Sequence, residues 1–222
     1  MCFVMESREV IENIDSIYER FKIPKHMQMH MRRAAATVKV VVDNWTGEDI
    51  NGEDAIVCLL LHDLGNVVRM SFGNNGLDDL YEESGGVDLM KKIKKEAVGI
   101  YGEDDHVATE KMCEELGISK RVMELMEEHT FHKNKDICSG EDMDLKICAY
   151  ADQRIGPRGV LNLKVRLEEA NERGKNRPWY NEFDDLLECA LKIEEQVLSN
   201  TSLSEDEIND EAVMPYLEHI NS

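Results

Sequence analysis

Residues 56–63 read Ile-Val-Cys-Leu-Leu-Leu-His-Asp, an unbroken apolar run that ends in two adjacent ionisable side chains, His62 and Asp63. The run is predicted to form most of a helix over residues 53–64, and an apolar run of this kind belongs in a protein core. Burying the imidazole and the carboxylate there without partners would cost on the order of several kcal/mol. The stretch therefore predicts a helical core with a polar site built into it.

The rest of the sequence also carries apolar residues at a helical period, without sustained apolar/polar alternation or a hairpin signal. The predicted fold class is all-α, a compact bundle of many helices around a buried site. A polar, glycine-rich stretch over residues 71–86 is the expected loop or lid. The predicted helices span residues 8–21, 24–45, 53–64, 87 to 99 or 102, 106–116, 120–129, 139–152, 162–173 and 184–197, and a capping box at Ser204 and Glu207 predicts a short terminal helix.

Capping residues set several of the predicted helix starts. Asn51, with Asp54 three residues later, resembles a capping box. Asp104 or Asp105 is expected to cap the helix that begins near residue 106. Ser139 is expected to open the helix that runs through residue 152.

Length and composition limit the possible protein classes. The 222 residues, 42% of them hydrophobic and 32% charged, suit one helical domain over residues 1–200 and a C-terminal tail over 201–222. No apolar stretch reaches the length of a membrane span, and the first residues do not resemble a signal peptide. We therefore expect a cytoplasmic protein whose six scattered cysteines stay reduced.

The formal net charge of -20 opposes binding to a nucleic-acid polymer, which needs a basic protein face. Against this background, residues 154–177 form a local positive island with seven Lys or Arg and three Glu. Such an island suits a small anionic ligand.

Four other ionisable residues repeat the pattern of residues 62–63, because each lies on or beside an apolar helical stripe: His30, His106, His129 and Asp152. Imidazoles and carboxylates that converge from several helices are typical of a buried metal site, since the cation compensates charge that the core cannot solvate. His26 and His132 lie close to two of these positions and are alternative or additional ligands.

The order His30, His62-Asp63, His106, His129, Asp152 resembles that of the HD superfamily of metal-dependent phosphohydrolases, over residues 26–166. The resemblance implies an HD-type helical domain that holds one or two divalent transition metal ions. The nitrogen-rich set without thiolates suits Fe, Mn, Co, Ni or Zn. By the same resemblance, His30, His62, Asp63 and Asp152 hold the first ion, Asp63 bridges to the second, and His106 and His129 complete the second site.

The implied reaction is hydrolysis of a small phosphorylated or nucleotide-like substrate by a metal-bound hydroxide, with Asp63 among the catalytic residues. Asp105, or its neighbour Asp104, is the candidate acid. The expected substrate-binding residues are Arg154, Arg158, Lys95 and Asn66, with Arg166 and Lys94 as further choices; Asn66 stands where many members of the superfamily have Lys.

Two other functions fit the same residues. A small branch of the superfamily consists of mixed-valent di-iron oxygenases, and such an enzyme would act on a small polar or phosphonate-like substrate with the same six ligands. A binding module that has lost catalysis is the third class, and the complete ligand set disfavours it. The sequence leaves substrate and oligomeric state open, with a homodimer among the expected forms.

Overall fold

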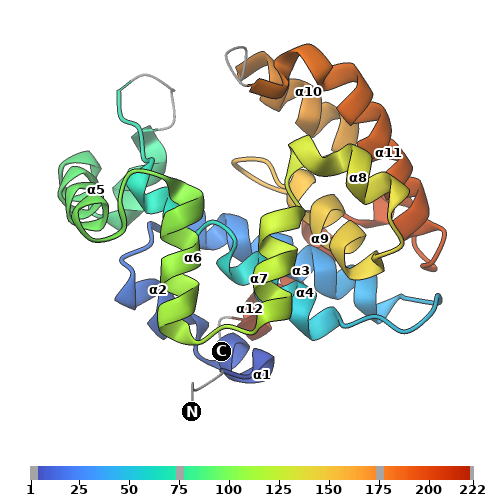
Figure 1. Ribbon diagram of the computed structural model, residues 1–222, viewed down its shortest axis with the longest axis horizontal. Coiled ribbons are helices and arrows are strands. Elements are labelled where there is room, and N and C mark those ends of the chain that lie inside the picture. The colour runs from blue at the N-terminus through green and yellow to red at the C-terminus, as the bar shows by residue number, and fades with distance from the viewer. Residues whose placement is uncertain (1–4, 74–77, 174–177, 221–222) are drawn as a thin grey trace.

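A computed structural model of the protein describes residues 5–73, 78–173 and 178–220 (Figure 1). Two of the predicted features extend into the other residues. Part of the expected loop over 71–86 lies outside the described residues, and so do Lys175 and Arg177 of the positive island.

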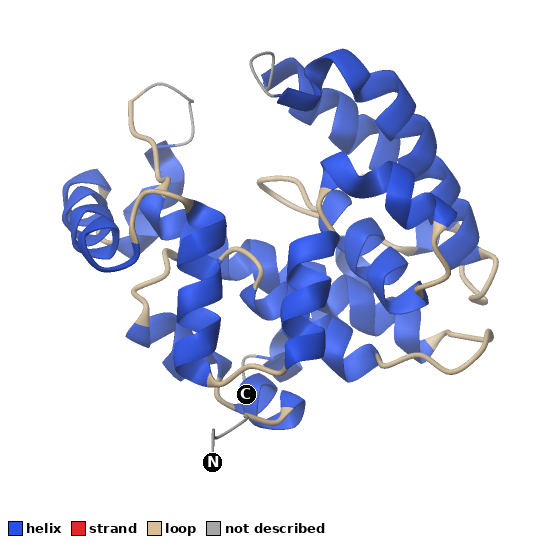
Figure 2. Ribbon diagram, in the orientation of Figure 1, coloured by secondary structure: helices blue, strands red, loops and turns tan. Residues whose placement is uncertain are grey.

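Every described element is helical, apart from two isolated β-bridges that join Trp45 to Thr201 and Ile155 to Val160 (Figure 2). The predicted all-α class is confirmed. The α-helices are α1 (Ser7–Glu12), α2 (Ile14–Arg20), α3 (Lys25–Asp43), α4 (Gly52–Leu61), α5 (Val87–Tyr101), α6 (Asp105–Leu116), α7 (Lys120–Glu128), α8 (Asn134–Ser139), α9 (Met143–Gln153), α10 (Leu163–Arg173), α11 (Phe183–Leu198) and α12 (Asp210–Ile220). The 3-10 helices are η1 (Leu64–Val68), η2 (Asp78–Ser84), η3 (Phe131–Lys133), η4 (Pro178–Glu182) and η5 (Glu205–Glu207).

The helices form two groups around a shared centre. Figure 1 shows α5 and α6 on one side, α8, α10 and α11 on the other, and α3, α4, α7 and α9 between them. Helix α3 packs against α4, α9 and α12, while η1, which follows α4, packs against α6. Among the described residues, no helix combines the length and the apolar character needed to cross a membrane.

The apolar run predicted from the sequence lies at the centre of the core. Every residue from Ala55 to Leu61 in α4 is buried, and so is every residue from Ile147 to Ala151 in α9. A helix that is apolar on all sides requires neighbours on all sides. Because α4 ends at Leu61, the chain delivers His62 and Asp63 directly from this buried helix into the interior.

Several predicted caps are confirmed. The Asn51 side chain accepts a hydrogen bond from the backbone nitrogen of Asp54 at 3.4 Å. Asp104, rather than Asp105, caps α6 by accepting from the backbone nitrogen of Val107 at 2.9 Å.

Two predicted helix limits are wrong. The first helix breaks at Asn13, whose side-chain amide donates to the carbonyl oxygen of Glu9 at 2.8 Å. A local side-chain bond of this kind competes with helix continuation. Ser139 ends α8 instead of opening the next helix, and Asp142 caps α9 by accepting from the backbone nitrogen of Leu145 at 3.2 Å.

The segment after residue 200, predicted as a tail with a short helix, contains η5 and α12. The capping box between Ser204 and Glu207 is present. Val213 of α12 is fully buried, and α12 lies against α3.

Gly65 allows the close approach of η1 to α6. A Cβ at this position would lie 2.6 Å from the backbone nitrogen of Thr109 and closer still to the carbonyl oxygen of Asp105. The backbone nitrogen of Gly65 also donates to the Thr109 hydroxyl at 3.0 Å. The glycine therefore sets the spacing between the chain that follows Asp63 and α6.

We predict that Gly65→Ala destabilises the fold by about 2 kcal/mol or more, because the added methyl group meets backbone atoms that cannot move aside. Gly99→Ala is the matched control, since a Cβ there meets nothing within 4 Å in the interior of α5. The control should stabilise the protein by about 0.5–1 kcal/mol. Urea unfolding of both variants measures the two effects, and equal stabilities would contradict the close crossing.

Candidate metal centre

Four side chains from three parts of the fold form one cluster, with His30 and His62 between the carboxylates of Asp63 and Asp152. His30 comes from α3, His62 and Asp63 follow α4, and Asp152 comes from α9. The Nε2 atoms of His30 and His62 both lie 3.2 Å from Oδ1 of Asp152. Both also lie 3.6 Å from Oδ2 of Asp63. The four atoms thus alternate between nitrogen and oxygen at nearly equal spacing.

This spacing fits a transition metal ion. Ligand atoms about 2.1 Å from one ion at tetrahedral angles lie about 3.4 Å from each other. The ligand atoms that His30, His62 and Asp152 offer all lie within 4.8 Å of one another, so these residues can hold an ion. Asp63 supplies a second carboxylate oxygen beside them. Imidazole nitrogens and carboxylate oxygens without thiolate form a donor set that suits first-row transition metals.

Backbone carbonyl groups orient two of the imidazoles. His62 Nδ1 lies 3.0 Å from the carbonyl oxygen of Leu59, and His129 Nδ1 lies 3.0 Å from that of Leu125. An imidazole that donates from Nδ1 to a carbonyl keeps Nε2 deprotonated and available as a ligand when neutral. The Nε2 atom of His62 is the one that faces the two carboxylates.

Three helices end at the site. His62 is the C-terminal cap of α4, His129 is that of α7, and Asp152 is the next-to-last residue of α9. A helix C-terminus carries partial negative charge, which favours a nearby cation and disfavours a carboxylate. The helix ends and the two carboxylates together demand a compensating positive charge.

The ionisation of the cluster reflects this demand. Burial disfavours the charged form of His62, but the carboxylates of Asp63 and Asp152 outweigh it and raise the pKa of His62 to about 10. Burial also opposes the charge on Asp152, but His62 and His30 hold the pKa of Asp152 well below its usual range. Burial lowers the pKa of His129, with a smaller contribution from His62. The raised pKa of His62 thus reflects the negative charge of the two carboxylates beside it.

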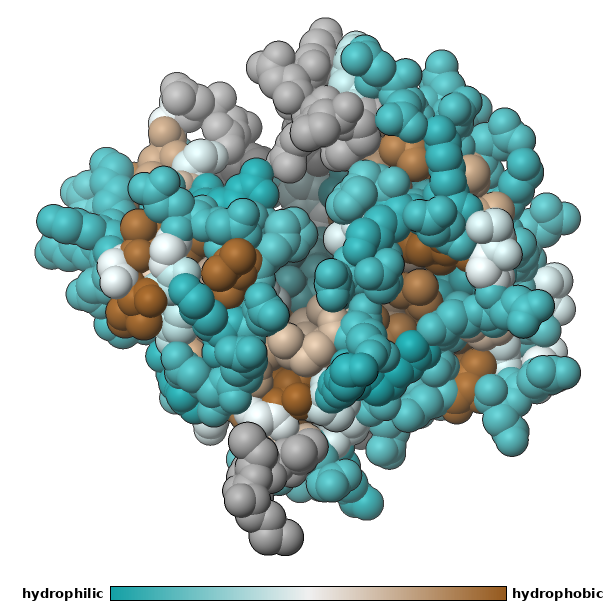
Figure 3. Space-filling model, viewed as in Figure 1, coloured by the Kyte–Doolittle hydropathy of each residue, from teal (hydrophilic) through white to brown (hydrophobic). Residues whose placement is uncertain are grey.

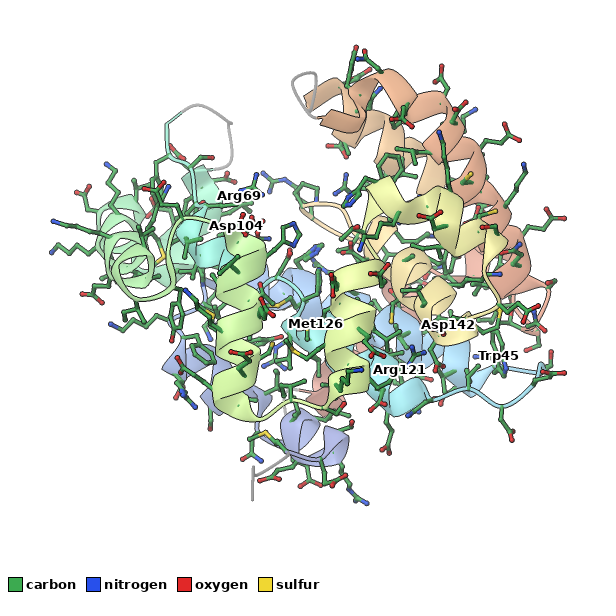
Figure 4. All side chains as sticks on the ribbon, viewed as in Figure 1. Trp45, Arg69, Asp104, Arg121, Met126 and Asp142 are labelled. Carbon is green, nitrogen blue, oxygen red and sulfur yellow. The ribbon has the colours of Figure 1, made fainter. Side chains whose placement is uncertain are left out.

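Charged residues at the start of α7 and α9 fix these helices against each other. The Arg121 guanidinium donates to both carboxylate oxygens of Asp142, at 2.7 and 2.8 Å (Figure 4). A paired contact of this kind restricts orientation as well as distance. Because His129 ends α7 and Asp152 lies near the end of α9, the pair helps to set the distance between the two side chains.

The two residues predicted to complete a second metal site lie in different surroundings. His129 is buried, and its ring centroid lies 5.3 Å from that of His62, beside the cluster. His106, in the first turn of α6, is exposed and lines an adjoining cavity of about 470 Å³. We call this cavity the polar recess; its lining includes His26, Asp63, Asn66, Arg69, Asp105, His106 and His132.

The polar recess brings several predicted site residues together. Asn66, a predicted substrate-binding residue, lines it together with Asp63. Asp105 lines it too, and its carboxylate accepts a hydrogen bond from Arg69 at 2.7 Å. His26 and His132, the alternative ligands, lie on the recess wall, and burial lowers the pKa of both imidazoles. Figure 4 shows Arg69 beside Asp104 at this end of α6.

The structure does not bring Arg154 to the cluster. Its guanidinium is buried and donates to the Tyr150 hydroxyl at 2.8 Å and to the carbonyl oxygen of Ile208 at 2.6 Å. It also lies 3.4 Å from the carboxylate of Glu194. Proximity to Asp152 in sequence was misleading, because residues two apart on a helix point to different sides. Arg154 connects α9 to the C-terminal segment.

Two more expected substrate-binding residues lie away from the four ligands. Lys95 is an exposed residue of α5 and lines a separate cavity beside Lys94. Arg158 is exposed and pairs with Asp79 at 3.1 Å. In contrast, Arg166 of α10 lines two cavities together with His30 and Asp63, and its Nε donates to the carbonyl oxygen of Ile155 at 2.6 Å. Among the described residues of the positive island, Arg166 is the one that lines cavities together with His30 and Asp63.

Comparison of the chain with protein-family models, with curated proteins and with solved structures found no match.

Sequence reasoning missed a group of apolar residues next to the ligands. Phe131, Leu167, Ala170 and Phe183 line a cavity that also contains His30, Asp63 and Asp152. They come from η3, α10 and α11, so that no local pattern connects them. Of these four residues, Phe131 is the one whose place near the site could be inferred from the sequence, because it follows His129 by two residues.

We predict that His62→Ala and Asp63→Ala each abolish metal loading, because each removes a ligand atom and leaves buried charge without a partner. Both variants should also show a lower Tm than the metal-loaded protein. Elemental analysis of protein purified without chelator measures the metal content. Asp88→Ala is the control and should keep its metal, because Asp88 is an exposed carboxylate of α5. Stoichiometric metal in both ligand variants would rule out the site.

Proposed function

We propose that the protein is a metal-dependent phosphohydrolase of the HD type that acts on a small phosphorylated substrate. One observation carries the proposal, which is that His30, His62 and Asp152 bring ligand atoms within 4.8 Å of one another, and Asp63 lies 3.6 Å from both imidazoles. These are the residues that the resemblance to the HD superfamily assigns to the first metal.

The donor set supports Fe, Mn, Co, Ni or Zn as the bound ion. Such an ion, when bound, polarises phosphoryl oxygens and makes water a better nucleophile at neutral pH. His129 beside the cluster and His106 on the recess wall are the candidates for a second ion.

Residues around the cluster would position the substrate. Arg166 can bind phosphoryl oxygens, because a guanidinium matches the geometry of a phosphate group. Asn66, which lines the same cavity as Arg166, can donate a hydrogen bond from its amide. A hollow between the two groups of helices, in a largely hydrophilic face, is visible in Figure 3. A phosphate group is thus surrounded by donors on more than one side.

The leaving group would receive its proton from the polar recess. His106, His132 and Asp105 line this recess. An imidazole is suited to proton transfer near neutral pH. The lowered pKa of His132 favours its neutral form, so it would also act as an acceptor. Asp105 remains a candidate for the acid, together with these imidazoles.

The test of the proposal is a set of three measurements on protein purified without chelator: metal content, release of inorganic phosphate from a panel of small phosphoesters, and oxygen consumption. We expect phosphate release that several divalent transition ions support and that His62→Ala abolishes. Two irons per chain, with oxygen uptake and no phosphate release, would instead identify the oxygenase.

We predict that Arg166→Gln lowers kcat/KM by about tenfold to a hundredfold for the phosphoester that the unmodified protein hydrolyses, because a charge-assisted hydrogen bond to the substrate is lost. Metal content should stay unchanged. Arg158→Gln is the matched control, since Arg158 is exposed and pairs with Asp79. Equal kinetics in both variants would remove Arg166 from the site.

A further inference from the structure

A cavity of about 240 Å³ adjoins the metal cluster on the side of α10 and α11. One wall is polar and includes His30, Asp63 and Asp152. The other wall is formed by four apolar side chains, and we call this part of the cavity the apolar recess: Phe131, Leu167, Ala170 and Phe183.

The apolar wall is firmly held. Phe183 and Leu167 are buried, and the ring centroids of Phe131 and Phe183 lie 5.9 Å apart at an interplanar angle of 39°. Ala170 is half-buried between longer neighbours on the same helix face. Its short side chain leaves space where a larger residue would fill the recess.

Polar groups at the edge of the recess are already paired. Gln153 lines the cavity, and its amide exchanges two hydrogen bonds with the buried amide of Asn134, at 2.9 and 3.0 Å. Because the amide is satisfied, this edge does not require a polar ligand. The demand for a charged ligand comes from the ligand residues and Arg166, which line the same cavity.

We propose that the apolar recess binds an aromatic or heteroaromatic ring of the substrate while its phosphoryl group lies at the metal cluster. The anionic part of this statement rests on the proposed function. Three properties support this arrangement: the cavity includes His30, Asp63 and Asp152 of the cluster, Arg166 lines it, and its apolar recess contains two phenyl rings. The substrate class is thus a small phosphoester that carries an aryl or heteroaryl ring.

The size of the cavity agrees with this occupant. An apolar cavity of about 150 Å³ already accommodates benzene. A volume of about 240 Å³ therefore admits one ring and part of an adjoining phosphoryl group. Aromatic rings gain further stabilisation from tilted or edge contacts with other rings. Phe131 and Phe183 can both make such contacts.

The experiment compares the equilibrium binding of phenylphosphonate and methylphosphonate, measured by calorimetry, to protein purified without chelator. Neither compound is a phosphoester, so binding is independent of hydrolysis. We expect the unmodified protein to bind phenylphosphonate about tenfold more tightly, because the ring leaves water for the recess. Equal affinities, including the absence of binding by both compounds, would overturn the proposal.

Two variants of α10 locate the effect. Ala170→Phe fills the recess and should reduce the preference for phenylphosphonate to about onefold, with methylphosphonate affinity and metal content unchanged. Val165→Phe is the matched control, since Val165 is exposed on the same helix, and it should keep the tenfold preference. If Ala170→Phe lowers the Tm, Ala170→Leu provides a smaller filler with the same expectation. If the Ala170 variants keep the preference for phenylphosphonate, the ring binds elsewhere and the proposed role of the apolar recess is wrong.

The outcomes separate this proposal from the proposed function. A tenfold preference that is lost in Ala170→Phe, together with no phosphate release from any phosphoester, would keep the recess and reject the phosphohydrolase. Phosphate release without any preference for phenylphosphonate would support the phosphohydrolase and reject the apolar recess as the ring-binding site.

Discussion

The structure depends on an excess of negative charge in its interior. Two carboxylates lie beside the C-terminal ends of three helices, and both kinds of group attract a cation. The two carboxylates also raise the pKa of His62. The chain keeps this arrangement although a purely apolar centre would be easier to bury. Three members of the cluster, His30, His62 and Asp152, could hold a metal ion.

The surrounding fold holds the ligands in place with few degrees of freedom. Helix α4 is buried on all sides, so the position at which it delivers His62 is set by the packing of the whole core. Gly65 then lets the chain pass within contact of α6. The Arg121–Asp142 pair fixes α7 against α9. Ligands supported in this way need little rearrangement when an ion binds, which favours affinity.

Much of this could be predicted from the sequence. The all-helical fold follows from a helical period along nearly the whole chain, and His62 with Asp63 stands out because polar residues end an apolar run. The convergence of His30 and Asp152 could be predicted from their apolar stripes. Substrate-binding residues were harder to predict, because the direction in which a side chain points decides whether it comes near the cluster. Arg154 is close to Asp152 in the chain but points elsewhere, whereas Arg166 reaches the cluster only through the packing of α10. The apolar recess is assembled from three separate elements, and no local pattern predicts such a surface.

The bonds of Arg154 have a consequence for the C-terminal segment. Its guanidinium donates to the carbonyl oxygens of Glu205 and Ile208, and it belongs to the same last turn of α9 as Asp152. A chain shortened before Glu205 would leave a buried guanidinium without these acceptors, two residues from a ligand carboxylate. The segment after residue 200 thus holds the end of α9 that bears Asp152. The geometry of the cluster therefore depends on residues that lie far from Asp152 in the chain.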